Sequence, residues 1–335
     1  MKNLSSENKK FKKTPDNSVV WGLIVCFYPD VDILSNLVRS LSDQVSVILI
    51  LNNGGIDNSL RNILLNFENV IFHDFECNKG IAAALNEGFL QAVARNADFV
   101  VTFDQDSCPE SEHVAGLMKQ WVALSSIDDV KINKKKVGAI GPSFYDARNG
   151  HFEYPFYRAN GLRVVKQYST NGVNFIQADA LITSGMLVPT TMWSSGLKFN
   201  ELLFIDFVDT EWCFRASKFG YINYGCFDVK MKHELSEAAP VIFLGLIILK
   251  YSPIRRYYHF RNCIYLIFQS YVPLAFKFRL IAGLLLRFFT APFVDEKPLS
   301  SIKNIFFGVF DALRGRYGYK VIPTASVAPV VKSLE

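Results

Sequence analysis

Two aspartates, Asp104 and Asp106, stand one residue apart directly after the apolar run "ADFVVTF", which is typical of a buried strand. Burying a carboxylate is costly unless a cation pairs with it, and two neighbouring carboxylates also repel each other. Hard oxygen ligands of this kind suit Mg²⁺ or Mn²⁺ bound together with a diphosphate. Acidic pairs at strand ends also occur as helix caps and solvated turns, so the pair alone leaves both interpretations open.

A second group of acids lies in "FIDFVDTEWCFR", which we expect to form a helix. On that helix Asp206 and Asp209 share a face, whereas Glu211 is about 200° round from Asp209. One aspartate could act as a general base toward an incoming hydroxyl, although acids at a helix N-terminus also simply complement its dipole. His233 in "MKHELSE" could complete a metal shell, but a lone histidine is more often a satisfied polar residue.

The elements that must position these side chains alternate regularly from residue 19 onward. Apolar runs typical of buried strands are followed by amphipathic segments typical of helices, which predicts a Rossmann-like α/β fold: a mostly parallel sheet with helices on both faces. Ligands bind such sheets at the carboxyl ends of the strands, where Asn52, Asn53 and Asp104 fall. The predicted strands and helices are "VVWGLIVCFY", "DILSNLVRSL", "VSVILIL", "NSLRNILLNF", "NVIFHDF", "GIAAALNEGFLQAVARN" and "ADFVVTF".

Composition divides the chain into four parts. Residues 1–18 are polar and basic and read as a disordered tail, residues 19–237 as the α/β domain, residues 238–320 as a basic, apolar helical region, and residues 321–335 as a second tail. The net charge of +5 does not indicate nucleic acid. No window reaches the roughly 18 uninterrupted apolar residues of a spanning helix, and no signal peptide is evident, so we expect a cytoplasmic protein.

Missing motifs exclude several nucleotide-binding classes. The chain has no G-x-x-x-x-G-K-[ST] sequence, which argues against P-loop chemistry, and no G-x-G-x-x-G follows the first predicted strand. A nucleotidylyltransferase would need a loop rich in glycine and basic residues after that strand, and "CFYPDVD" has none. What remains is a metal–diphosphate site on a sheet that lacks the usual glycine loop.

An ordered set of motifs resembles the family 2 glycosyltransferases of GT-A fold, and among them the bacterial rhamnosyltransferases of polysaccharide assembly. The match covers about residues 20–265, and "RRYYHFRN" near its end also fits the subgroup. The form "DQDS" together with "FIDFVDTEW" is what points toward rhamnose. The matching segments are "CFYPD", "LILNNGG", "CNKGIAAALNEG", "FDQDSCP", "ITSGMLV", "FIDFVDTEWCFR" and "HELSE".

The resemblance implies roles for individual residues. Asp106 would be the principal metal ligand, with Asp104 holding ribose or metal-bound water and His233 joining from the far side. Asp209 would be the base, with Asp206 as the second choice, although Val208–Asp209 stands where the family usually has Glu-Asp. Many relatives also carry Asp where Asn52 stands. The residues implied to bind the nucleotide donor, besides Asp104, are Tyr28, Asn52, Asn53, Asn78, Lys79, Gly80 and Asn86.

The implied activity is inverting transfer of L-rhamnose from dTDP-L-rhamnose, with Mg²⁺ or Mn²⁺, to a lipid-linked saccharide of a bacterial O-antigen or capsule. There are two alternatives. One is a transferase that uses another donor, such as a UDP-hexose or galactofuranose nucleotide, and the other is a catalytically silent membrane-surface binding protein. Residues 238–294 contain seven basic residues and no acid. We therefore expect "VIFLGLIIL" and "CIYLIFQSYVPLAF" to lie at the inner membrane surface, although a pair of core helices would also explain them.

Overall fold

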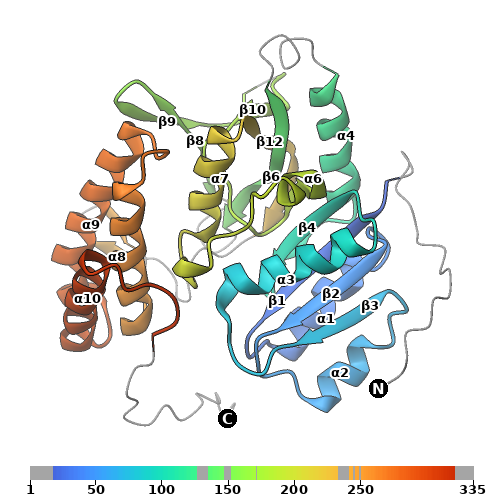
Figure 1. Ribbon diagram of the computed structural model, residues 1–335, viewed down its shortest axis with the longest axis horizontal. Coiled ribbons are helices and arrows are strands. Elements are labelled where there is room, and N and C mark those ends of the chain that lie inside the picture. Colours follow the sequence, from blue (N-terminus) through green and yellow to red (C-terminus); the bar gives the residue numbers. More distant parts are fainter. Residues whose placement is uncertain are drawn as a thin grey trace.

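The computed structural model describes residues 18–126, 135–146, 152–170, 172–232, 241–243, 246–248 and 250–320. An α/β body built on one large sheet is joined along one side by a layer of three helices (Figure 1). The first half of the chain alternates strands and helices as predicted. Its elements are β1 (Val20–Cys26), α1 (Val31–Leu41), β2 (Val47–Asn52), α2 (Asn58–Leu64), β3 (Val70–Asp74), α3 (Gly80–Ala94), β4 (Phe99–Asp104), β5 (Cys108–Pro109) and α4 (His113–Ser125).

The remaining elements complete the sheet and form the helical layer. Those of the α/β body are β6 (Lys136–Asp146), β7 (Phe152–Glu153), β8 (Phe156–Asn160), β9 (Arg163–Gln167), β10 (Phe175–Gln177), β11 (Met186–Pro189), α6 (Thr190–Ser194), η2 (Glu201–Leu203), α7 (Val208–Lys218) and β12 (Tyr221–Lys232). The last part contains β13 (Val241–Phe243), β14 (Leu246–Ile248), α8 (Pro253–Phe268), α9 (Leu274–Val294) and α10 (Pro298–Leu313).

The strand order of the main sheet is β10-β12-β6-β11-β4-β1-β2-β3. Strands β3, β2, β1 and β4 run parallel, so their carboxyl ends meet at one edge, and β6 and β12 are also parallel to each other. Strand β11 is antiparallel to both β4 and β6 and joins the two parallel parts. The mostly parallel sheet is therefore confirmed. Strand β12 is 12 residues long.

Two hydrophobic clusters cover the two faces of the sheet, because alternate side chains of each strand point in opposite directions. On β1, Trp21 packs with the cluster that includes Trp212 of α7. Ile24 packs on the other face with Leu34 of α1 and Leu117 of α4. All of these side chains are buried. Helices therefore lie on both faces of the sheet, as the alternating pattern predicted.

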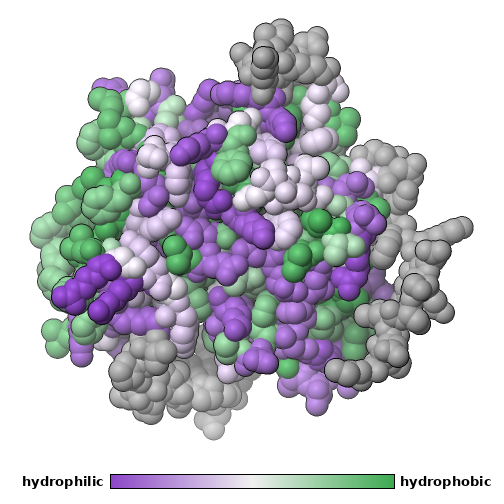
Figure 2. Space-filling view, in the orientation of Figure 1, coloured by the Kyte–Doolittle hydropathy of each residue, from purple (hydrophilic) through white to green (hydrophobic). Residues whose placement is uncertain are grey.

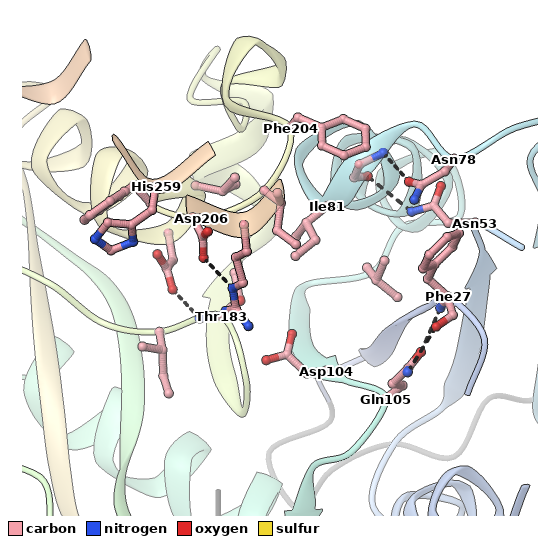
Figure 3. A pocket seen from close by; sticks show the side chains of 18 of the residues that line it. Phe27, Asn53, Asn78, Ile81, Asp104, Gln105, Thr183, Phe204, Asp206 and His259 are labelled. Carbon is pink, nitrogen blue, oxygen red and sulfur yellow. Dashed lines mark hydrogen bonds and ion pairs between the residues drawn. The ribbon is translucent and has the colours of Figure 1, made fainter. Parts of the chain in front are cut away.

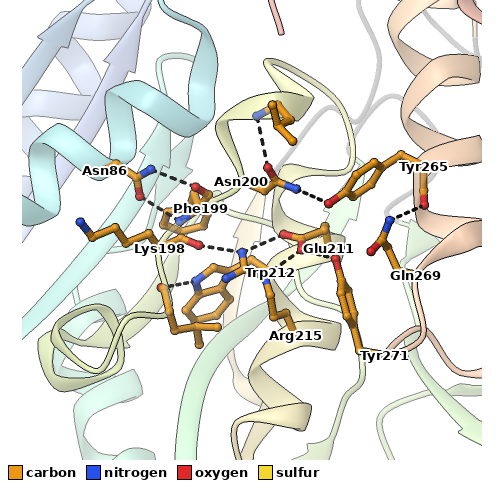
Figure 4. A network of polar contacts seen from close by, with 12 residues as sticks. Asn86, Lys198, Phe199, Asn200, Glu211, Trp212, Arg215, Tyr265, Gln269 and Tyr271 are labelled. Atoms are coloured by element: carbon orange, nitrogen blue, oxygen red, sulfur yellow. Dashed lines mark hydrogen bonds and ion pairs between the residues drawn. The ribbon is translucent and has the colours of Figure 1, made fainter. Parts of the chain in front are cut away.

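The helical layer is attached to the α/β body through a buried carboxylate. Glu211 on α7 accepts hydrogen bonds from Arg215 Nε at 2.8 Å and from the Tyr271 hydroxyl at 2.6 Å (Figure 4). Asn200 Nδ2 donates to the Tyr265 hydroxyl at 2.9 Å beside it. Glu211, which faces away from Asp209 on the predicted helix, thus links α7 to the turn after α8. A buried carboxylate with these partners is a structural residue.

The predicted membrane segments fold differently from the expected interfacial helices. In "VIFLGLIIL" the described residues form the antiparallel strands β13 and β14. In "CIYLIFQSYVPLAF" the side chains of Cys263, Leu266 and Phe276 are buried between helices, so this stretch contributes to a core. Among the residues that the structure describes, no helix combines the length and the apolar character needed to cross a bilayer.

Candidate active site

A cavity of about 520 Å³ opens at the carboxyl edge of the parallel strands (Figure 3). The ends of β1 and β4, the start of α3, the loop before α7 and the start of α8 form its walls. This position is where the strand pattern placed the ligand site. Of the residues predicted from the sequence, seven line the cavity: Asn53, Asn78, Gly80, Asp104, Asp106, Asp206 and Asp209.

Gln105, between the two aspartates, fixes the end of β4 against the end of β1. Its Oε1 accepts from the backbone N–H of Phe27 at 2.7 Å, and its Nε2 donates to the Phe27 carbonyl at 3.2 Å (Figure 3). Burial and the charge of Asp106 raise the pKa of Asp104 from 3.8 to about 7, while Arg255 acts in the opposite direction. A carboxylate that is costly to ionise in this way is stabilised by a bound cation.

The donor set at Asp104 and Asp106 fits a hard divalent cation. Both side chains line the cavity, and Asp106 is exposed. Within the described ranges no three His, Cys, Asp or Glu side chains gather closely enough to hold a metal unaided. Mg²⁺ and Mn²⁺ are commonly bound by one or two carboxylates with substrate phosphates completing the shell, so this pair is sufficient in kind. His233, the expected third ligand, lies outside the described residues.

Asp209, in the first turn of α7, is held by backbone donors. Its Oδ1 accepts from the N–H of Thr210 at 2.6 Å and its Oδ2 from the N–H of Thr183 at 3.3 Å. Burial raises the pKa of Asp209 from 3.8 to about 6, the Thr210 N–H lowers it, and the charge of Asp104 raises it further. A fixed carboxylate with a pKa near neutrality is suited to general-base chemistry.

Asp206 does not lie on the helix, so the shared helical face predicted for Asp206 and Asp209 is wrong. The residues before α7 have left-handed backbone conformations, with φ values of 64° at Phe204, 62° at Asp206 and 65° at Phe207. A right-handed helix cannot continue through such residues, and α7 begins only at Val208. The Asp206 carboxylate accepts from Arg255 Nε at 3.2 Å, which makes it a partner of a cation.

Two adjacent side chains of α8 hold this strained loop. Asn262 Nδ2 lies within hydrogen-bonding distance of the carbonyls of Leu203, Ile205 and Asp206, at 2.7 to 3.0 Å. Arg261 Nη2 donates to the Leu203 carbonyl at 3.0 Å. Left-handed bulky residues cost about 1–3 kcal/mol each and persist where surrounding contacts fix them. The "RN" of "RRYYHFRN" therefore shapes the cavity wall.

The start of α3 forms the opposite wall. Asn78 Oδ1 accepts from the N–H of Gly80 at 2.8 Å, and Asn53 Oδ1 accepts from the N–H of Lys79 at 3.1 Å. Gly80 has a φ of 81°, and a Cβ placed there would lie 2.6 Å from the Phe204 carbonyl oxygen. Glycine is required here because both the backbone conformation and the close approach of the loop exclude a side chain.

The other predicted donor residues are not among those lining the cavity. Tyr28 and Lys79 are exposed outside it, and Phe27 lines it in place of Tyr28. Asn52 donates to Asp74 Oδ1 at 2.8 Å and accepts from the N–H of Gly54 at 3.0 Å, which holds the "NNGG" turn. Asn86 is buried, with its Oδ1 accepting from the Phe199 N–H at 2.8 Å (Figure 4).

The cavity is also lined by residues of α8 and of the segment before it, and these were not predicted from the sequence. Arg255 and His259, four positions apart on one face of α8, both reach it, as does Tyr251. Burial and three neighbouring arginines hold the pKa of His259 well below its ordinary value, so its imidazole is neutral. The i, i+4 spacing of Arg and His in "RRYYHFRN" is the signal that could have identified them.

Comparison with known sequences finds one matching family and one similar protein. Residues 23–161 match Glycosyl transferase family 2. Over 304 residues the chain is 29% identical to the dTDP-rhamnosyl transferase RfbF of Shigella flexneri. The aligned segment covers 90% of this chain and 98% of that protein. These two similarities support the resemblance to family 2 rhamnosyltransferases that the ordered motifs indicated.

Solved structures show the same fold at low sequence identity. Residues 1–349 of TarS from S. aureus have a TM-score of 0.51 and 15% identity, covering 89% of this chain and 82% of that one. GalNAc-T7, solved with UDP, GalNAc and Mn²⁺, has a TM-score of 0.52 and 12% identity, covering 82% of this chain and 57% of that one. These similarities confirm the predicted GT-A fold.

Proposed function

We propose that the protein transfers L-rhamnose from dTDP-L-rhamnose to a saccharide hydroxyl with inversion at the anomeric carbon. The observation that carries this proposal is that Asp104, Asp106 and Asp209 line one cavity. The chain also aligns over nearly its whole length with a protein named as a dTDP-rhamnosyl transferase. Cation-binding carboxylates and a separate basic carboxylate at one site are what a displacement at a sugar diphosphate needs.

Each residue then has a defined task. Asp209 accepts the proton of the acceptor hydroxyl, which attacks the anomeric carbon as the bond to the diphosphate breaks. Asp104 and Asp106 would hold Mg²⁺ or Mn²⁺, which when bound neutralises the charge that develops on the leaving diphosphate. GalNAc-T7 of the same fold was solved with Mn²⁺. Arg255, oriented by Asp206, adds a permanent positive charge at the same cavity.

The acceptor is proposed to be a lipid-linked saccharide of O-antigen or capsule assembly. This part of the proposal is supported by the motif resemblance and by the apolar, basic composition of residues 238–294. The protein would then work in the cytoplasm as a peripheral protein on the inner face of the cell membrane. The following experiment separates this proposal from two alternatives. One is transfer from a UDP-hexose or galactofuranose nucleotide, and the other is silent membrane binding without transfer.

The experiment follows the sugar. The protein is incubated with Mn²⁺, dTDP-L-rhamnose labelled in the sugar, and detergent-solubilised lipid extract from a bacterium with rhamnose-containing surface polysaccharide. Label should enter the lipid fraction with wild-type protein and with Glu68→Ala, which removes an exposed carboxylate outside the cavity lining. Asp106→Ala should transfer none. Equal labelling by Asp106→Ala, or labelling only from a UDP-sugar, would contradict the proposal.

A further inference from the structure

Helix α9 presents apolar side chains to solvent. Phe278, Ile281, Leu285, Phe289 and Phe293 follow one another at spacings of three or four residues, so they form one stripe along the helix. Their exposed fractions lie between 40% and 72%. The outward stripe of a helix on a soluble protein is normally polar, because the apolar stripe faces the core. On α9 the outward side is as apolar as the inward side.

Helix α10 extends the same exposed character. Phe306, Phe310 and Leu313 again lie three or four residues apart, with exposed fractions between 47% and 67%. Helix α10 packs against both α8 and α9. In Figure 2 apolar side chains gather along the left margin, where Figure 1 places α9 and α10. These eight residues, five on α9 and three on α10, are called the α9–α10 face below. Contiguous apolar surface of this kind marks an interaction site.

The charges beside this face have one dominant sign. Between residues 274 and 316 the exposed charged side chains are basic with one exception, the acid Glu296. Asp311 is paired with Lys320 at 2.9 Å, and Asp295 with Arg256 at 2.6 Å, so these two acids do not offset the surface charge. The exposed basic residues are Arg279, Lys297, Lys303, Arg314 and Arg316.

From this combination we infer that the α9–α10 face inserts into the interface of an anionic lipid bilayer. Exposed phenylalanine and leucine enter the acyl boundary while the basic side chains meet phosphate headgroups. A second copy of the chain would bring another basic face against this one, and like charges disfavour that pairing. The inference deepens the proposed function, because α8, which lines the cavity with Arg255 and His259, packs directly against α9 and α10.

The surface differs from the one that the sequence indicated. Arg256 and Arg261 are fully buried, Arg256 against Asp295 and Arg261 against backbone carbonyls, so neither meets a headgroup. The apolar residues that face outward lie mainly after Phe276. Hydrophobic runs therefore mark where the helical layer lies, and only the packing shows which side of it is left exposed.

The test is flotation of the full chain with vesicles of phosphatidylglycerol and phosphatidylcholine, against vesicles of phosphatidylcholine alone. We expect binding to the anionic vesicles that weakens as salt rises. Leu285→Glu/Phe289→Glu should bind at least about tenfold more weakly, since each apolar side chain buried contributes about that factor. The matched control is Leu90→Glu/Phe219→Glu, which changes two side chains exposed to a similar degree outside α9 and α10 and should bind as wild type does.

A rim variant, Lys303→Glu/Arg314→Glu, keeps the apolar stripe and should lose the salt-dependent part of binding. Equal binding of all variants, or absence of binding to anionic vesicles, would overturn the inference. So would a wild-type dimer that Leu285→Glu/Phe289→Glu dissociates in ultracentrifugation. Release of dTDP from dTDP-L-rhamnose without vesicles separates the two proposals. If dTDP is released but the protein does not bind vesicles, only the membrane inference fails. If the protein binds vesicles but releases no dTDP, only the proposed function fails.

Discussion

Replacing Asp209 by Asn tests the assignment of the base. The substitution keeps the shape of the side chain and the acceptor for the Thr210 N–H, and it removes basicity. General-base catalysis contributes about 10² to 10⁴ in rate, so transfer should fall by about that factor while donor affinity stays nearly unchanged. The assay is initial rate of sugar transfer at saturating donor and Mn²⁺, with donor affinity from calorimetry.

The raised pKa of Asp209 gives this prediction two further readouts. Transfer by wild-type protein should rise with pH through about 6 and then level off, because only the ionised carboxylate accepts a proton. Because folding raises the pKa of Asp209 above its ordinary 3.8, the folded state binds the Asp209 proton more tightly than the unfolded state does. Protonation of Asp209 therefore stabilises the folded protein at low pH, and this contribution is lost as the pH rises from about 4 to 6. Each pKa unit corresponds to about 1.4 kcal/mol. Metal-free Asp209→Asn should therefore be more stable than wild type above pH 6, by about 1–3 kcal/mol, in denaturant unfolding with EDTA.

Asp206→Asn is the matched control, since it makes the same change in the neighbouring aspartate of the cavity. Its carboxylate pairs with Arg255 and precedes α7, so its loss should reduce transfer less than the loss of Asp209. The reverse order of the two variants would refute the assignment. So would transfer by Asp209→Asn at more than about a tenth of the wild-type rate.

Four other substitutions, one of them also combined with a second change, have expected outcomes. Asp106→Ala should abolish the dependence of donor binding on a divalent cation, whereas Asp104→Ala should leave part of it, as measured by calorimetry with and without EDTA. Gly80→Ala should weaken donor binding and lower stability by about 1–3 kcal/mol, because its Cβ would meet the Phe204 carbonyl at 2.6 Å. Arg256→Met should cost about 3–5 kcal/mol in unfolding free energy by leaving Asp295 buried without its partner, and adding Asp295→Leu should recover much of that loss.

The parallel half of the fold and the main carboxylates could be predicted because their signals are local. Strands β1, β2 and β4 are mostly apolar, and Asp104 is the last residue of β4, so pattern and topology place it at the sheet edge. Asp209 is likewise marked by a cluster of acids at the start of a predicted helix. These inferences needed no knowledge of distant contacts.

The loop before α7 could not be predicted because its conformation is imposed from a distance. Phe204, Asp206 and Phe207 have positive φ values, but none of them is a glycine that would signal this backbone conformation in the sequence. In this loop the carbonyls of Leu203, Ile205 and Asp206 are held by Arg261 and Asn262, which lie more than 50 residues further along the chain. The same applies to Arg255 and to the α9–α10 face. Hydropathy shows that a helix is apolar, and only tertiary packing shows which of its sides is covered.

The most direct test of the central claim is release of free nucleoside diphosphate from a panel of sugar nucleotides, with and without a divalent cation. We predict that dTDP is released from dTDP-L-rhamnose, that UDP-hexoses and galactofuranose nucleotides are turned over much more slowly, and that excess EDTA stops the reaction. Full release in excess EDTA would contradict the role of Asp104 and Asp106. Preference for a UDP-sugar would contradict the donor assignment, and no release from any donor would contradict transfer at this cavity.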